Sequence, residues 1–268
     1  MRPSLLLRIN LLIISLLLIS CKKQDYPPTQ GLVLYYTFDG NMADASGNNN
    51  NGINYTSNNY VPGRWGQALD FNGTSDFIQL TNTINSSNGL SFSFWIKSRG
   101  ANGIENNGAI VSKYNMSTKS RCFMIYSFGS DSTRNDNRLS AAFYYSGITA
   151  SYNDNVKSYL EANELLIYSN PLLWSIINPT RLEIGSWTHC VINVTPTAVE
   201  SWINGVLCTK KTREYTTYFD NPDEPIYIGN NIRGGDGGNN HFNGIIDELR
   251  IYNRGLTSKE IETLYKEK

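Results

Sequence analysis

The sequence predicts an all-β protein: a two-sheet antiparallel β-sandwich closed by a short C-terminal helix. Its 17 Tyr, 10 Phe and 22 Gly, with many asparagines, are typical of strands joined by tight turns. Short segments of alternating hydrophobicity recur between turn signals, as in residues 90–97. Helical periodicity appears only near the end, where Thr257 and Glu260 form a capping-box pattern ahead of an apolar stripe of Ile261, Leu264 and Tyr265.

Residues 1–20 have the pattern of a bacterial lipoprotein signal peptide. Arg2 and Arg8 precede an apolar run over residues 9–19 that is too short to span a membrane comfortably, and the small residue Ser20 and then Cys21 follow it. We expect cleavage before Cys21 and lipidation of its thiol, which would hold the protein on a membrane surface. A signal peptide in which Cys21 is incidental is the alternative.

Residues 21–30 are then a lipidated tether, stiffened by Pro27 and Pro28. Its residues 22–25 resemble the surface-export signals of Bacteroidetes lipoproteins, although with fewer acidic residues. This resemblance implies a lipoprotein anchored in the outer membrane and exposed at the cell surface.

Charge and cysteine content limit the function classes. The formal net charge is +0, and no basic stripe or charge run indicates a nucleic-acid partner. Cys122, Cys190 and Cys208 permit one disulfide at most. The sequence does not say which pair would form it, and buried thiols are an equal alternative.

The domain is expected to begin at Gly31 and to continue as short strands. We expect them at residues 32–38, 90–97, 109–113, 122–126, 139–145, 187–194, 199–203, 225–229 and 245–252, with two more within 63–80. Asn204 and Gly205 supply a hairpin turn before Val206. These intervals favour an antiparallel sandwich.

The loop at residues 39–48 is a candidate cation site. Asp39 and Asp44 lie five residues apart among glycines and asparagines, which is the composition of an oxygen-ligand loop. An Asx-turn loop, whose side chains cap their own backbone, is the alternative.

Residues 245–252 predict the strand around which the domain is organised. Strict alternation places Asp247 on the core face with Ile245, Leu249 and Ile251, and places Glu248 on the opposite face. A buried carboxylate is costly, so we expect Asp247 to meet a metal ion, a cation or several backbone N–H groups.

Seven motifs in order resemble a laminin-G-like jelly roll of the concanavalin A-like lectin/glucanase superfamily. They are residues 35–41 (YYTFDGN), 44–48 (DASGN), 66–73 (GQALDFNG), 94–97 (FWIK), 187–189 (WTH), 202–205 (WING) and 244–254 (GIIDELRIYNR). The resemblance implies one such domain over residues 31–268, elaborated at about 127–186. It also implies a structural calcium ion held by Asp39, Asn41, Asp44 and Asp247.

We predict no enzymatic activity. The Glu-x-Asp-x-x-Glu pattern of jelly-roll glucanases does not occur in the sequence, and alternation would keep Asp247 and Glu248 on opposite faces. His189 is expected to be a structural hydrogen-bonding residue.

Carbohydrate binding is the predicted function. Trp65, Tyr145 and Trp174 lie in turn-rich or variable segments and are candidates to stack on sugar rings, although Trp174 could instead belong to a small satellite core. Trp95 and Trp202 are expected to be packing residues. A protein–protein adhesion or scaffold module is the first alternative, and an accessory subunit of a polysaccharide-utilisation system is the second.

Overall fold

The computed structural model describes residues 26–81, 84, 89–100, 108–115, 120–128, 137–144, 173–212, 224–231 and 240–267. Within this part the strands are β1 (Leu32–Tyr36), β2 (Ile53–Asn54), β3 (Tyr60–Pro62), β4 (Gln67–Asn72), β5 (Ile78–Leu80), β6 (Leu90–Ser98), β7 (Gly108–Asn115), β8 (Ser120–Phe128), β9 (Arg138–Tyr144), β10 (Leu173–Arg181), β11 (Thr188–Val194), β12 (Ala198–Ile203), β13 (Val206–Thr212), β14 (Ile226–Ile228) and β15 (Asn243–Tyr252). The helix is α2 (Ser258–Lys266).

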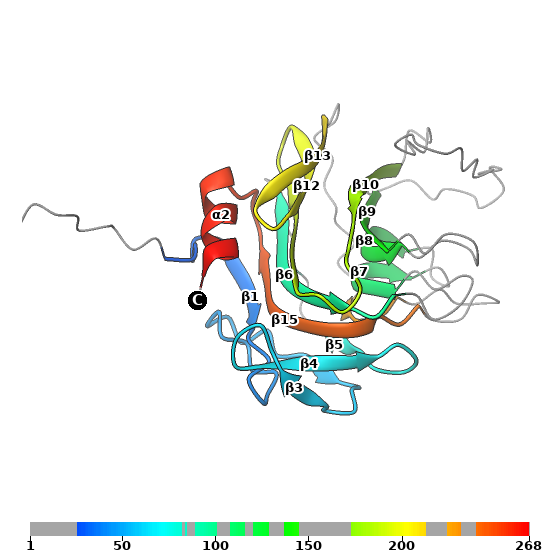
Figure 1. Ribbon diagram of the computed structural model, residues 1–268. Coiled ribbons are helices and arrows are strands. Elements are labelled where there is room, and N and C mark those ends of the chain that lie inside the picture. Colours follow the sequence, from blue (N-terminus) through cyan, green and yellow to red (C-terminus); the bar gives the residue numbers. More distant parts are fainter. Residues whose placement is uncertain are drawn as a thin grey trace, which may run out of the picture.

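These strands form two antiparallel sheets that face each other as a sandwich (Figure 1). The eight-stranded sheet has the order β13-β12-β11-β6-β15-β4-β3, and β1 pairs with β15 as well. The seven-stranded sheet has the order β10-β9-β8-β7-β14-β5-β2. The predicted fold class, with its single short C-terminal helix, is therefore confirmed.

The main core fills the space between the sheets. Phe92, Phe94 and Ile96 of β6 point into it, as their alternation predicts, and Phe123 of the opposite sheet packs against Phe92 with ring centroids 4.9 Å apart. Trp95 alternates with these residues and therefore points to the outer face of the eight-stranded sheet.

Strand β15 departs from strict alternation at one position, and the predicted phase is wrong there. Glu248 has φ of 52°, and the register shifts between Asp247 and Arg250, so two residues occupy the place of one. As a result Ile246 and Leu249 both face the core. Asp247 lies outside the core cluster, in cross-strand register with Trp95.

The bulge coincides with a change of neighbour along β15. Its first half pairs with β4 up to Ile246, and its second half pairs with β1 from Leu249 onward. Asp247 and Glu248 lie in the interval between these two partners. The bulge therefore removes the alternation that was expected to keep the Asp247 and Glu248 carboxylates on opposite faces.

Helix α2 covers a second, smaller core on the outer face of the eight-stranded sheet. Ile261 and Leu264 pack there against Trp202 of β12 and Tyr252 of β15. The predicted capping box is present, because the side chain of Thr257 accepts a hydrogen bond from the N–H of Glu260 while the Glu260 carboxylate accepts one from the Thr257 N–H.

The cysteine positions bear on the open disulfide question. Cys122 and Cys190 belong to the main core, in opposite sheets, and Cys208 packs against that core from β13. Strand β12 lies between the strands that carry Cys190 and Cys208. The Cα atoms of Cys190 and Cys208 are therefore two strand spacings apart, about 9.6 Å, whereas a disulfide needs ~4.4–6.8 Å. This spacing excludes a disulfide between Cys190 and Cys208.

Several sequence predictions fall on residues outside the described part. They are the signal peptide 1–20, the lipidation site Cys21, the ligand candidate Tyr145 and most of the elaboration at 127–186. Among the described residues, no helix combines the length and the apolar character that a membrane span requires.

Candidate functional site

The carboxylate of Asp247 holds the turn that precedes β4. Asp247 is 0% exposed, and its Oδ2 accepts hydrogen bonds from the backbone N–H groups of Arg64 (2.7 Å) and Trp65 (3.2 Å). Its Oδ1 is buried and has no hydrogen-bond partner among the described residues. Of the three partners expected from the sequence, backbone N–H groups are therefore present.

Asp39 holds the other end of the same turn, where its Oδ1 accepts a hydrogen bond from the Gln67 N–H at 2.7 Å. Glycine is required at both contacts. A Cβ on Gly66, whose φ is 49°, would lie 2.0 Å from Asp39 Oδ1, and a Cβ on Gly63 would lie 2.6 Å from Asp247 Oδ2. The turn at residues 63–67 is thus shaped so that two carboxylates can close on it.

Asp44 has the role of the Asx-turn alternative. Its two oxygens accept hydrogen bonds from the N–H groups of Tyr35, Ser46 and Asn50 and from the Ser46 hydroxyl, at 2.8–3.0 Å. Burial alone would raise the pKa of Asp44, but these donors, led by the Ser46 hydroxyl, lower it below its usual value. The carboxylate orders its own loop.

The residues predicted to bind calcium fit an ion in part. Asp39 and Asp247 border one turn, and Asp247 Oδ1 is a buried acceptor available to a cation. The Asp44 oxygens are already satisfied, and the Asn41 Oδ1 accepts the Ala43 N–H. Within the described ranges, no three His, Cys, Asp or Glu side chains gather as a metal cluster.

An aromatic row runs from this turn across the outer face of the eight-stranded sheet. Trp65, half-buried, packs edge-on against Trp95 with ring centroids 5.3 Å apart. The Arg64 guanidinium lies 4.6 Å from the Trp95 ring centroid. Trp95 also stacks on Tyr265 of α2, with ring centroids 5.8 Å apart. On β11, the strand beside β6, the ring centroid of His189 lies 5.2 Å from that of Trp95.

Asp247 and His189 lie on the two strands beside Trp95, and burial shifts the pKa of each so that its neutral form is favoured. For Asp247, burial and then the charge of Glu248 raise the pKa to about 7, against the opposing N–H groups of the turn. For His189, burial and then the charge of Arg250 lower the pKa to about 3. The Ser93 hydroxyl lies 3.0 Å from His189 Nε2, which confirms the predicted structural role.

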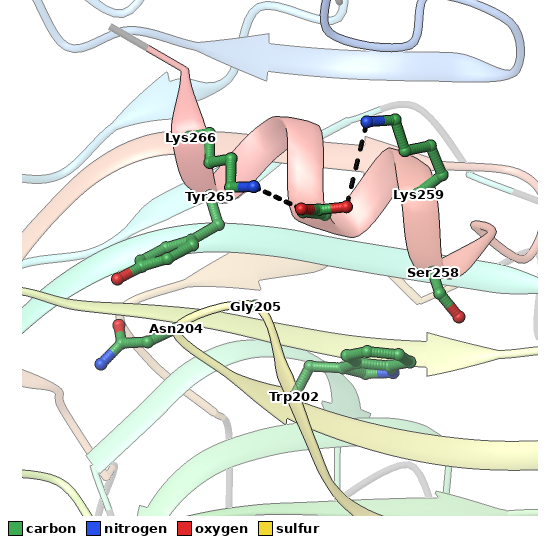
Figure 2. A pocket seen from close by; sticks show the side chains of 8 residues that line it. Trp202, Asn204, Gly205, Ser258, Lys259, Tyr265 and Lys266 are labelled. Atoms are coloured by element: carbon green, nitrogen blue, oxygen red, sulfur yellow. Dashed lines mark hydrogen bonds and ion pairs between the residues drawn. The ribbon is translucent and has the colours of Figure 1, made fainter.

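The row ends at a groove between α2 and the hairpin of β12 and β13. The groove has a volume of about 400 Å³ and is lined by Trp202, Asn204, Gly205, Ser258, Lys259, Glu262, Tyr265 and Lys266. Figure 2 shows the rings of Tyr265 and Trp202 toward its two ends, with the Gly205 turn between them. Glu262 forms ion pairs with both lysines on the helix wall.

The groove offers an aromatic ring beside polar groups. Tyr265 is half-buried, whereas Trp202 is 8% exposed and donates its indole N–H to Glu200 at 3.1 Å. Asn204 is exposed at the turn, although its Oδ1 also accepts the His189 N–H. Such a combination can stack on one face of a sugar ring and hydrogen-bond to its hydroxyl groups.

None of the three residues predicted to bind ligand is among the residues that line the groove. Trp65 lies at the far end of the aromatic row, and Tyr145 is outside the described part. Trp174 lies on β10 in register with Phe143, but its side chain is also outside the described part. Sequence reasoning assigned Trp202 to packing and Tyr265 to the apolar stripe of the helix, so it did not find the groove.

A family profile described as concanavalin A-like lectin/glucanases superfamily, of laminin G type, matches residues 72–262. The chain belongs to this superfamily. The assignment confirms the resemblance carried by the seven motifs. A search of curated proteins gave no match.

Several solved structures share this fold. Domain 4 of AbnA, a GH43 extracellular arabinanase from Geobacillus stearothermophilus, solved in complex with arabinotriose, is 23% identical with a TM-score of 0.58. That match covers 88% of this chain and 98% of the arabinanase domain. The binding domain of Paraclostridial Mosquitocidal Protein 1 is 18% identical with a TM-score of 0.62, and the match covers 88% of this chain and 52% of that domain's chain.

A structure of botulinum neurotoxin type C, whose cell entry depends upon interaction with two ganglioside molecules, is 16% identical with a TM-score of 0.59. That match covers 88% of this chain and 51% of the toxin chain. This chain therefore corresponds to about half the length of either toxin chain. At these identities the likeness establishes the shared fold.

We predict that Asp247 and His189, on the two strands beside Trp95, change the free energy of unfolding in opposite directions as the pH rises from 5 to 6.5. The measurement is urea unfolding, with chelator present so that no metal ion binds Asp247. Folded Asp247 retains a proton that the unfolded carboxyl has lost, so this residue stabilises the fold more as the pH falls. Folded His189 excludes a proton that the unfolded ring binds, so this residue stabilises the fold more as the pH rises.

Relative to wild type, Asp247→Asn should therefore gain about 1 kcal/mol of stability per pH unit as the pH rises, and His189→Gln should lose about as much. The lowered pKa of His241 acts equally in all three proteins and cancels in the comparison. Identical slopes in the three proteins would contradict the prediction.

Proposed function

We propose that this protein is a non-catalytic carbohydrate-binding protein whose groove beside α2 holds the glycan. The observation that carries the proposal is the half-buried ring of Tyr265, which lines the groove beside the Asn204 amide and the charged wall of the helix. The arabinanase domain solved with arabinotriose supports the proposal as a relative of similar fold and length. Trp65, at the other end of the row, remains a second candidate for stacking.

The lining of the groove favours binding over hydrolysis. Glycoside hydrolysis commonly uses two carboxylates, about 5–5.5 Å apart in retaining enzymes. Glu262 is the one carboxylate among the residues lining the groove, and it is engaged by Lys259 and Lys266. We therefore assign the groove a holding role.

A glycan array tests the groove. Wild-type protein should bind defined glycans, and Ser258→Trp, which places a bulky ring at the exposed mouth, should weaken that binding about tenfold or more. Glu183→Trp, at another exposed position, is the matched control and should bind like wild type. Thermal melts should show both variants folded.

Two outcomes of the array would redirect the proposal. Glycan binding unaffected by Ser258→Trp would remove the groove from the site. A blank array with well-folded wild-type protein would favour an adhesion or scaffold role with a protein partner, for which the exposed Val206 and Leu207 on the hairpin are available.

We further propose that the protein is anchored by lipid at Cys21 in the outer membrane, where it would serve polysaccharide capture or uptake. Two hydrogen bonds hold the end of the proposed tether, residues 28–30, against the domain. The Tyr252 hydroxyl donates to the Pro28 carbonyl at 3.1 Å, and Arg254 Nε donates to the Gln30 carbonyl at 2.9 Å. The tether therefore leaves the domain beside β15.

Metabolic labelling with palmitate tests the anchor. The wild-type chain should incorporate label and fractionate with outer membranes, while Cys21→Ser should do neither. Cys208→Ser is the matched control and should be labelled like wild type. Label retained in Cys21→Ser would exclude this attachment site.

We also propose calcium as a structural brace, with Asp39 and Asp247 as its side-chain ligands on the two sides of the turn at residues 63–67. The ion would neutralise the buried Asp247 carboxylate, whose Oδ1 otherwise has no partner in the described part. Asp44 is not included, because its oxygens are used within the loop.

Chelator should lower the melting temperature of the wild-type protein by roughly 5–10 °C, since calcium at a hundred times its Kd adds about 2.7 kcal/mol. Asp247→Asn and Asp39→Asn should melt at the same temperature with and without chelator. Asp44→Asn should destabilise the loop yet keep the chelator response. A wild-type melt indifferent to chelator would end the calcium proposal.

A further inference from the structure

A second exposed aromatic surface lies at the edge of the other sheet. Tyr55 follows the edge strand β2 and stacks on Phe77, with ring centroids 4.5 Å apart and an interplanar angle of 14°. The backbone N–H of Tyr55 donates to the Phe77 carbonyl at 3.0 Å. Because one face of the Tyr55 ring lies on Phe77 and the side chain is 47% exposed, its other face is presented to solvent.

The stack is supported from beneath by further rings. Phe77 packs at 6.2 Å against Tyr227 of β14 and at 6.1 Å against His241. Tyr227 is buried, and His241 Nδ1 lies 3.3 Å from the Asp76 carbonyl. Tyr55 is therefore the outermost ring of a packed aromatic column.

The segment that carries Tyr55, residues 54–58, is held in shape by its own hydrogen bonds. Asn54 Oδ1 accepts the Thr56 N–H at 2.7 Å, and the Thr56 hydroxyl accepts the Asn58 N–H at 3.1 Å. Asp76 accepts both the N–H and the hydroxyl of Ser57 at 3.0 Å. A surface ordered in advance in this way loses little conformational entropy on binding.

The polar groups that the described segment 54–58 places around the ring are neutral. Residues 54–58 contribute amides and hydroxyls, and the nearby Asp76 carboxylate is buried and engaged by Ser57 and the Asn72 N–H. An exposed ring with neutral donors and acceptors beside it matches a sugar ring, which has an apolar face and a hydroxyl rim.

We propose that Tyr55, Phe77 and residues 54–58 form a second carbohydrate subsite, for an uncharged sugar ring of a polysaccharide. This inference rests on the proposed glycan-binding function and adds a contact on the opposite sheet from the groove. Two contacts on one polymer raise its apparent affinity through effective concentration.

A protein partner fits this surface less well. Ile53 and Tyr55, 44% and 47% exposed, are the two large exposed hydrophobic residues on this edge within the described part. A stable protein interface buries about 800 Å² on each partner, with a more extensive apolar centre. One ring and one aliphatic side chain suit a single sugar unit.

The test is affinity electrophoresis of the full chain in native gels containing dextran, galactomannan, mixed-linkage β-glucan or linear arabinan, with polygalacturonate as the acidic comparison. At least one neutral polymer should retard the wild-type protein, and Tyr55→Ala should weaken that retardation about tenfold. Tyr26→Ala removes a tyrosine that is 74% exposed on the tether and should leave retardation unchanged. Tyr55→Phe keeps the ring and should retain most of the binding.

The groove variant Ser258→Trp separates this inference from the proposed function. Loss of retardation in Ser258→Trp, with Tyr55→Ala and wild type equal, would overturn the second subsite and leave the groove in place. Loss in Tyr55→Ala alone would support the subsite and overturn the groove. Stronger retardation by polygalacturonate than by every neutral polymer would contradict an uncharged ligand, and no retardation of wild type by any polymer would overturn both sites.

Discussion

The hydrogen bonds from the turn at residues 63–67 to the buried Asp247 carboxylate are the constraint on which this half of the sandwich depends. These bonds lie where the pairing of β15 with β4 ends and its pairing with β1 begins. Without the carboxylate, the N–H groups of Arg64 and Trp65 would lose these hydrogen bonds. The left-handed backbone at Glu248 brings the carboxylate to the outer face. Glycine at 63 and 66 lets the turn approach it.

The same turn determines where the aromatic row begins. Once Asp247 fixes the backbone at Trp65, the ring of Trp65 packs edge-on against Trp95, and Trp95 in turn supports Tyr265. The groove and the turn are therefore parts of one surface. Three packed rings, those of Trp65, Trp95 and Tyr265, join the two ends of this surface.

Alternation in sequence was sufficient for β6, where Phe92, Phe94 and Ile96 face the core as expected. It failed within β15, because one left-handed residue reverses the phase and the sequence around Glu248 gives no turn signal such as glycine or asparagine. Asp247 is buried as expected, but not for the expected reason: alternation placed it on the core face, whereas it lies outside the main core and is bonded to the turn at residues 63–67.

The groove was beyond sequence reasoning for a different reason. Trp202 and Tyr265 are more than 60 positions apart, and each has a sufficient local explanation, in a strand and in the apolar stripe of a helix. Only the packing of α2 across the β12–β13 hairpin brings them to one opening. The capping box, by contrast, was readable because its partners are three residues apart.

The pairing of β1 with β15 has a mechanical consequence for a protein held by its N-terminal end. The chain enters at Pro28 and Gln30, bonded to Tyr252 and Arg254, and continues antiparallel along the second half of β15. Tension along β1 would load the hydrogen bonds between β1 and β15 together, in shear. The force would pass first to β15, which lies inside the sheet and not at its edge. If the protein is anchored and binds a polymer as proposed, these ladder bonds would carry the load between the polymer and the membrane.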